Sequence, residues 1–321
     1  MPLKHKSSQT HHEFNFSPAD FVPFRDTEVL ERVRHISRDQ IEQHSNPDFC
    51  ITVMPDADVE FRWLLDMFGR IKDTSDAGEK QVLLLPNPYP NYVWLAAMIN
   101  RFRVDCKKVW FFAMDEFANE HDQIAPIDWP QSLVGSMLKY LYANIDEDLR
   151  PPMKQVIGPN DQNIRDFGTI LEDAGNADCV YIGPGWTGHL CFIEPTSPEF
   201  SAQSLDEWKT MGPRVNTLHP LSIAQQSLHG VFGLSGDVAA IPPKGATVGP
   251  AQIIAAKHRI DMHALSIHGT ATTWQRLISR LVMHGPVTPL VPESILQTLR
   301  TDVWVSETIA ANIEQDWVKG Y

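Results

Sequence analysis

Hydrophobic and polar residues alternate along the chain in two distinct patterns. Short, continuously apolar runs recur, each bounded by turn residues, and such runs are typical of strands that are covered on both faces. They lie at residues 49–55, 81–88, 107–117, 178–185, 245–252, 259–269 and 301–308. Between them, apolar residues recur at helical spacing at 59–72, 91–102, 131–145, 163–175 and 270–285.

This alternation predicts an α/β fold with an open, mostly parallel sheet and helices on both faces. Ligands of such sheets bind beyond the carboxyl ends of the strands. We therefore expect several loops to meet around one crevice, namely those after Pro86, Met114, Gly183, Gly249 and Gly269.

The N-terminal part of the chain has a different character. Residues 3–14, "LKHKSSQTHHEF", are polar and predict a disordered tail, whereas 26–44 carry apolar residues at helical spacing and predict an amphipathic helix. We expect this helix to pack on the body or on a second subunit. The predicted division is a polar extension over 1–45 with this helix, and a single α/β domain over 46–321.

Charge and composition exclude several classes of protein. The 321 residues have a formal net charge of −13, which disfavours binding to nucleic acid. No apolar stretch approaches the length of a membrane span, and the start of the chain lacks a secretory signal pattern. The four cysteines form no C-x-x-C pair. These features predict a reduced, cytoplasmic protein that binds neither nucleic acid nor membrane.

Two carboxylates follow directly on an apolar run. In "VWFFAMDEF" the run leads into Asp115 and Glu116, where a substrate would lie in the predicted sheet. One interpretation is catalytic, and the other is that Asp115 caps the following helix. The sequence leaves both interpretations open.

A glycine-rich loop places a histidine after another predicted strand. "GPGWTGHLCFIEP" carries three glycines, His189 and, five residues later, Glu194. Glycine allows close backbone approach, and a nearby carboxylate can fix the tautomer of an imidazole and raise its basicity. A histidine with a purely structural role is the alternative. Trp186 in this loop could stack against the apolar face of a sugar ring.

These stretches, in this order, resemble the glucosamine-6-phosphate deaminase/isomerase family. "FFAMDEF" is similar to the family's M-D-E-[YF] strand end, and "IGPGWTGHLCFIEP" resembles its G-x-G-x-D-G-H-I-A-F-N-E-P loop. "DWPQSLVGSML", "RVNTLHPLSIAQQS" and "GATVGPAQIIAA" resemble further segments. The related 6-phosphogluconolactonases share the G-H loop but lack the later glutamate, so Glu194 favours the deaminase branch.

The resemblance implies a modified dinucleotide-binding (Rossmann-like) sheet, a sugar phosphate or amino sugar as ligand, and no organic cofactor or metal. It implies that Asp115 is the base that moves a proton between C2 and C1 of the sugar. His189, supported by Glu194, would assist ring opening. The implied substrate-binding residues are Glu116, Gly185, Trp186, Thr187, Gly188, Arg214, Asn87 and Tyr89. A homo-oligomer is also expected.

Three departures from the family pattern concern the ligand. Thr187 stands where the family has an aspartate, so ring opening should be impaired, and Thr187→Asp should raise the rate. The family's phosphate-binding turn is "PNPYPN" here, and prolines 88 and 90 have no N–H to offer a phosphate. The lysine expected after the last strands is replaced by "SIHGTATTW", and Asn216 stands where a second family lysine is expected.

These departures predict a divergent enzyme whose ligand lacks a phosphate at the usual place. The alternative is a catalytically silent sugar-binding or regulatory paralogue. His258, His263 and His268 recur at intervals of five, which suits neither a strand face nor a helical pair, so a metal site is not expected.

Overall fold

The computed structural model describes residues 16–314 except 265, 268–269 and 272. Its centre is a seven-stranded sheet in which every pairing is parallel, with strand order β1-β12-β9-β6-β2-β3-β5. The strands are β1 (Phe49–Met54), β2 (Gln81–Leu85), β3 (Val109–Ala113), β5 (Val156–Ile157), β6 (Cys179–Ile182), β9 (Arg259–His263) and β12 (Thr301–Ser306). The predicted α/β fold is confirmed.

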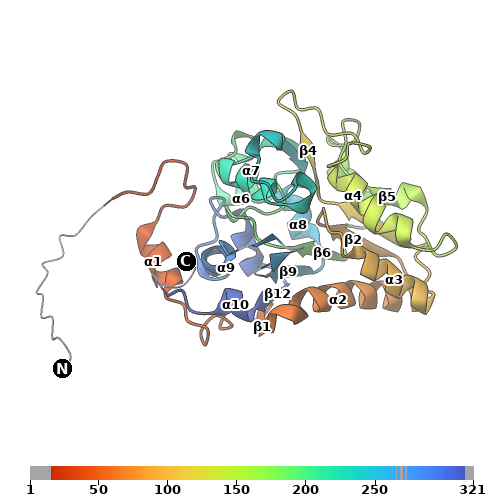
Figure 1. Cartoon of the computed structure of the whole chain (residues 1–321), viewed down its shortest axis with the longest axis horizontal. Helices are drawn as coiled ribbons and strands as arrows, with labels where there is room; N and C mark the ends of the chain where they lie inside the picture. Colours follow the sequence, from red (N-terminus) through yellow and green to blue (C-terminus); the bar gives the residue numbers. More distant parts are fainter. Residues whose placement is uncertain (1–15, 265, 268–269, 272, 315–321) are drawn as a thin grey trace, which may run out of the picture.

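Helices cover both faces of this sheet because successive strand residues point to opposite sides. In β2, Leu83 and Leu85 belong to one apolar core, whereas Val82 and Leu84 belong to the other. The first core contains α2 (Asp56–Asp76), α3 (Tyr92–Phe102) and α4 (Leu133–Tyr140), and Figure 1 shows α2 and α3 together along one side of the strands. The second contains α5 (Phe167–Asp173), α6 (Leu205–Lys209), α8 (Pro250–Ala255), α9 (Gln275–His284) and α10 (Glu307–Ala310).

A second, smaller sheet lies beyond the main one. It is antiparallel and consists of β4 (Asp115–Ala118), β8 (Lys244–Thr247) and β7 (Arg214–Thr217), in that order. The helix α7 (Pro220–Ser227) follows β7 in the chain. The run at 245–252 predicts a strand of the mostly parallel sheet, but residues 245–247 belong to β8 of this antiparallel sheet and residues 250–252 begin α8. The apolar pattern could not separate the two because Ala246 and Thr247 are fully buried in either case. A short pair, β10 (Ser266–Ile267) and β11 (Thr270–Ala271), completes the strands of the described residues.

The predicted N-terminal helix over 26–44 is shorter in the structure. α1 spans Thr27–Arg34 and begins at Asp26, whose carboxylate accepts hydrogen bonds from the backbone N–H groups of Glu28 and Val29. The chain then continues in turns, and the side chain of Gln40 accepts a hydrogen bond from the N–H of Ser37. Val33 packs with side chains of α9, so the expected packing on the body is confirmed. Residues 3–14 lie outside the described residues.

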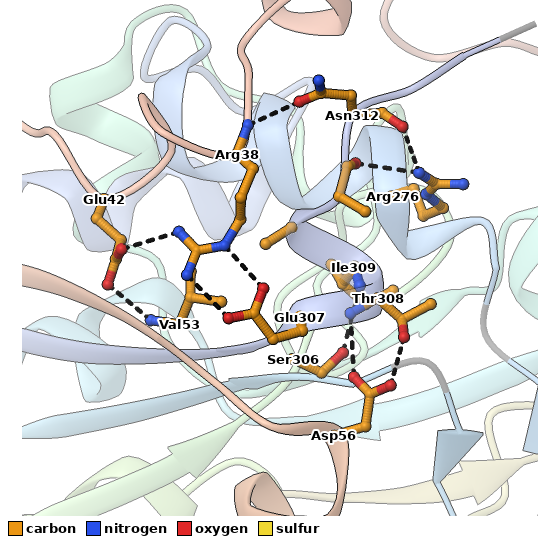
Figure 2. A network of polar contacts seen from close by, with 12 residues as sticks. Arg38, Glu42, Val53, Asp56, Arg276, Ser306, Glu307, Thr308, Ile309 and Asn312 are labelled. Carbon is orange, nitrogen blue, oxygen red and sulfur yellow. Dashed lines mark hydrogen bonds and ion pairs between the residues drawn. The ribbon is translucent and has the colours of Figure 1, made fainter.

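Charged side chains tie this segment to the C-terminal part of the chain (Figure 2). The guanidinium of Arg38 donates to both carboxylate oxygens of Glu307, at 2.8 and 3.0 Å, and to Glu42 at 2.9 Å. These two carboxylates raise the pKa of Arg38, and Arg38 lowers the pKa of Glu307. Asp56, at the start of α2, accepts from the hydroxyl and N–H of Thr308. The N-terminal segment and α2 are thus both anchored at α10.

Candidate active site

A cavity of about 150 Å³ lies at the carboxyl ends of the central strands. Its lining includes Pro86 after β2, Met114 after β3, Gly183 after β6 and Met262 of β9. The expected meeting of loops is therefore confirmed for three of the five. Gly249 does not line this cavity, and Gly269 lies outside the described residues.

Asp115 lines this cavity from the first position of β4. Its side chain is almost fully buried, and its Oδ1 has no hydrogen-bond partner among the residues described. Burial raises the pKa of Asp115 well above its ordinary value, and the neighbouring carboxylate of Glu116 raises it further. When ionised, such a carboxylate is a stronger base than one in water, since its charged form is poorly solvated.

Glu116 points elsewhere, although it is the next residue. Its carboxylate accepts hydrogen bonds from the Ser132 hydroxyl at 2.6 Å and from the N–H groups of Leu133 and Val134, each at 2.9 Å. It thereby satisfies the N-terminus of α4. Helix capping, which the sequence left open for Asp115, is the work of Glu116. Glu116 does not line the cavity, so the structure does not place it with a ligand there.

His189 lines the same cavity, and Glu194 lies behind it. The Nδ1 of His189 is 3.2 Å from Oε1 of Glu194 and 2.9 Å from the hydroxyl of Ser222. All three side chains are buried. Oε1 of Glu194 has no hydrogen-bond partner among the described residues, so the hydrogen bond of Nδ1 is to Ser222, and Nε2 is the ring nitrogen that remains for exchange with a ligand.

Thr187 contacts Glu194 and not the imidazole. Its hydroxyl donates to Oε2 of Glu194 at 3.1 Å, while Oε1 faces His189. Thr187 therefore holds the carboxylate that orients the ring. An aspartate at 187 would place a second negative charge against Glu194, so the expectation that Thr187→Asp raises activity is reversed by this geometry.

The glycines of the loop allow the histidine to fit. A Cβ on Gly185 would lie 1.9 Å from Nε2 of His189, so any larger residue would displace the ring. Gly188 has a φ of +74°, a left-handed conformation that favours glycine. Neither glycine lines the cavity. Trp186 also lies outside the lining, and its indole stacks on Trp274, a residue that does line it.

The remaining predicted binding residues divide into two groups. Asn87 and Tyr89 line the cavity, although the Tyr89 hydroxyl donates to Glu60 at 2.9 Å. Arg214 does not line it, because its guanidinium donates to the backbone oxygens of Gly212 and Glu199. Arg214 and Asp115 are both paired with Thr247 across the small sheet, so Arg214 is near Asp115 but contributes no side-chain group to the cavity.

Several residues that line the cavity are not predicted as site residues by any motif or pattern in the sequence. They are an indole from α2, a second indole and an amide from the start of α9, and two amides from α7, namely Trp63, Trp274, Gln275, Gln225 and Gln226. Within an amphipathic helix a buried tryptophan or glutamine reads as part of the core. Only the fold shows which of them face a cavity.

A second buried polar cluster lies close to this loop. The Nε2 of His263 is 2.7 Å from Oδ2 of Asp261, and its Nδ1 is 2.7 Å from the hydroxyl of Ser279. Glu293 contacts Asp261, and its backbone N–H donates to the carbonyl of Gly188 at 3.0 Å. All four side chains are fully buried. We call this set the Asp261–Glu293 cluster.

The described residues give little support for a cysteine nucleophile or for a metal site. Burial raises the pKa of the Cys191 thiol at the cavity wall well above its ordinary value, so a thiolate nucleophile is disfavoured. No group of three or more His, Cys, Asp or Glu side chains in the described ranges is arranged to hold a metal ion. No described helix is long and apolar enough to cross a bilayer.

Comparison with known proteins supports the resemblance. No model of a known protein family matches the chain. A glucosamine-6-phosphate deaminase from Lachnoclostridium phytofermentans is 24% identical over 230 residues, which cover 68% of this chain and 86% of that protein. A monomeric glucosamine-6-phosphate deaminase has a similar solved structure, with a TM-score of 0.62, 17% identity, and coverage of 82% of this chain and 98% of that one.

The lactonases are similar in fold as well. The 6-phosphogluconolactonase from Leishmania guyanensis has a TM-score of 0.57 and 14% identity, covering 83% of this chain and 98% of that one. The chain is thus similar in sequence to a glucosamine-6-phosphate deaminase and shares the fold of a solved deaminase and of the 6-phosphogluconolactonases, which is consistent with a divergent member of the deaminase/isomerase family.

Proposed function

We propose that this protein is an enzyme that isomerises or deaminates an amino sugar or sugar phosphate by acid–base catalysis. The observation that carries the proposal is that Asp115 and His189 line one cavity at the carboxyl edge of the sheet. Isomerisation of an aldose needs one base at carbon and one separate acid/base group at oxygen. This pair of side chains supplies both.

The two groups divide the work according to their surroundings. Asp115, with an unpartnered oxygen at the cavity, accepts the proton from C2 of the open-chain sugar and returns it to C1. His189 exchanges a proton with the ring oxygen through Nε2, while Ser222 forms a hydrogen bond with Nδ1 and the carboxylate of Glu194 lies 3.2 Å from it. No metal or organic cofactor is required for either proton transfer.

The proposal is tested by ammonia release and by aldose–ketose interconversion on hexosamines and their 6-phosphates. Asp115→Asn keeps the shape of the side chain but cannot accept a proton, so we expect the rate to fall about 10²–10⁴-fold. Asp128→Asn, at an exposed aspartate, is the matched control and should leave the rate unchanged. A rate that survives Asp115→Asn would exclude Asp115 as the base.

A catalytically silent sugar-binding paralogue is the second candidate. It is favoured by Thr187 in place of a carboxylate and by the prolines of the turn after β2. Sugar binding without turnover of any hexosamine or hexosamine phosphate would select it over the enzyme.

A further inference from the structure

Polar atoms without partners converge on the cavity that contains Asp115 and His189. Within the described part of the chain, no hydrogen-bond partner is found for Nε1 of Trp63, Oδ1 of Asn87, or either amide atom of Gln275. All three residues line the cavity, as does Asp115 with its unpartnered Oδ1. The set comprises indole and amide donors together with amide and carboxyl acceptors.

These unpartnered groups lower the stability of the folded protein unless a ligand forms hydrogen bonds with them. A buried donor or acceptor with no partner destabilises the folded state, and most such groups in native proteins are hydrogen-bonded. Gln275 is the extreme case, since its side chain is fully buried and both amide atoms are unpartnered. Four amide side chains line the cavity in all, Asn87, Gln225, Gln226 and Gln275.

The cationic side chains are occupied elsewhere. No lysine or arginine is among the described residues that line this cavity. Arg214 binds backbone carbonyls, and Nζ of Lys244 lies 2.6 Å from the carboxylate of Asp122. Lys139 lines a separate cavity of about 620 Å³, which shares Pro88 and His229 with the first. A dianionic phosphate inside the first cavity would lie near Asp115 without a lysine or arginine from these residues to neutralise it.

Aromatic rings complete the walls. Trp63, Tyr89 and Trp274 line the cavity, and the rings of Trp63 and Tyr89 are packed together with centroids 5.0 Å apart. Flat apolar surfaces beside scattered neutral hydrogen-bonding groups suit a molecule with apolar ring faces and hydroxyl groups around its edge.

We infer that Gln275, Trp63 and Asn87 form a recognition set for the hydroxyl or amide groups of an unphosphorylated sugar, and that they determine specificity at this site. A hydroxyl both donates and accepts, so hydroxyls can satisfy indole, amide and carboxyl groups together. The inference rests on the cavity of the proposed function but does not require turnover.

The Gln275→Leu variant distinguishes a role of Gln275 in sugar binding from a purely structural role. Removing the unpartnered amide should leave stability unchanged or raise it, while sugar binding should weaken about 10-fold or more because its hydrogen bonds are lost. Gln155→Leu is the matched control, since the Gln155 amide is buried but donates to the carbonyls of Lys107 and Val109. The control should lose stability and keep its affinity. Trp63→Phe removes the indole donor and part of a ring packed in the first core, so it should weaken binding and also lower stability.

The panel for calorimetry is glucosamine, galactosamine, N-acetylglucosamine and their 6-phosphates. We expect at least one of the unphosphorylated sugars to bind about 10-fold or more tightly than its 6-phosphate. Tight binding of such a sugar without ammonia release or isomerisation would exclude the proposed enzyme and leave this inference standing. The inference would be overturned by tighter binding of a 6-phosphate, whether or not Lys139→Ala abolishes it, by a panel in which no unphosphorylated sugar binds, or by a Gln275→Leu variant with unchanged affinity.

Discussion

Glu293→Gln is expected to stabilise the protein increasingly as pH rises. Glu293 is fully buried, and burial raises the pKa of its carboxyl well above the ordinary value, with Asp261 as the next cause. The raised pKa means that the folded protein holds the proton of Glu293 to a higher pH than the unfolded chain does. Glutamine has nearly the same shape and carries no titratable proton, so the variant removes this difference between the two states.

The sign and size follow from proton linkage. Above about pH 4.3, the ordinary pKa of glutamate, the unfolded chain releases the proton of Glu293 while the folded protein retains it. The unfolded state then binds fewer protons, and the stability of the wild type falls as pH rises. The loss is about 1.4 kcal/mol per pH unit for one group, and the glutamine variant does not suffer it. The advantage of the variant should therefore grow with pH above about 4.3, by at most about 1.4 kcal/mol per pH unit, until the pH reaches the raised folded-state pKa of Glu293.

Urea denaturation at pH 5, 6 and 7 measures this difference. For a chain of 321 residues, each 1 kcal/mol of added stability corresponds to a rise in Tm of about 1.5 °C in a parallel thermal scan. Glu147→Gln, at an exposed glutamate, should follow the pH dependence of the wild type. A Glu293→Gln variant whose advantage is constant with pH, or shrinks as pH rises, would show that Glu293 is ionised in the folded protein.

Two further predictions concern the histidine loop. Gly185→Ala places a Cβ 1.9 Å from Nε2 of His189, so it should lower any turnover about 10²–10⁴-fold, the range of an acid–base group. Gly212→Ala is the control, because its Cβ meets nothing within 4 Å and the rate should stay unchanged. Thr187→Asp should lower activity because it sets a carboxylate against Glu194, while Thr187→Ser should retain the hydroxyl donor and most of the rate; faster turnover in the aspartate variant would refute this account.

The sequence predicted the main sheet well because its strands are buried on both faces. A run such as "QVLLL" in β2 is apolar throughout, and this pattern has few other interpretations in a chain that alternates with amphipathic helices. The junction at Asp115 and Glu116 was harder. The chain leaves β3 and immediately enters β4 of another sheet, so two adjacent carboxylates point in different directions, one to a cavity and one to a helix terminus. The spacing of apolar residues along the chain does not indicate that the chain changes from one sheet to another at this point.

The candidate site was predicted in part for a related reason. Asp115 and His189 lie in the segments that follow β3 and β6, and the carboxyl ends of neighbouring parallel strands bring such segments to one edge of the sheet. Gln275 and Trp63 lie on helices, where the same residue types are common in the core, so only the arrangement of α2 and α9 around the cavity distinguishes them. The motif predicts Arg214 at the site, but its guanidinium donates to backbone carbonyls of the segment before β7 and of the short 3-10 helix Pro198–Phe200.

Asp115 and Glu293 show why a raised pKa alone does not identify a catalytic group. Burial is the main cause of the shift in both carboxyls, and each is increased by a second carboxylate nearby. Asp115 lines the cavity, where a substrate proton can reach it, whereas Glu293 contacts Asp261 and lines none of the cavities described here. A substrate in the cavity therefore cannot exchange a proton with Glu293. The backbone N–H of Glu293 donates to the carbonyl of Gly188, which connects Glu293 structurally to the His189 loop. Access to the cavity, more than the size of the shift, makes Asp115 the candidate base.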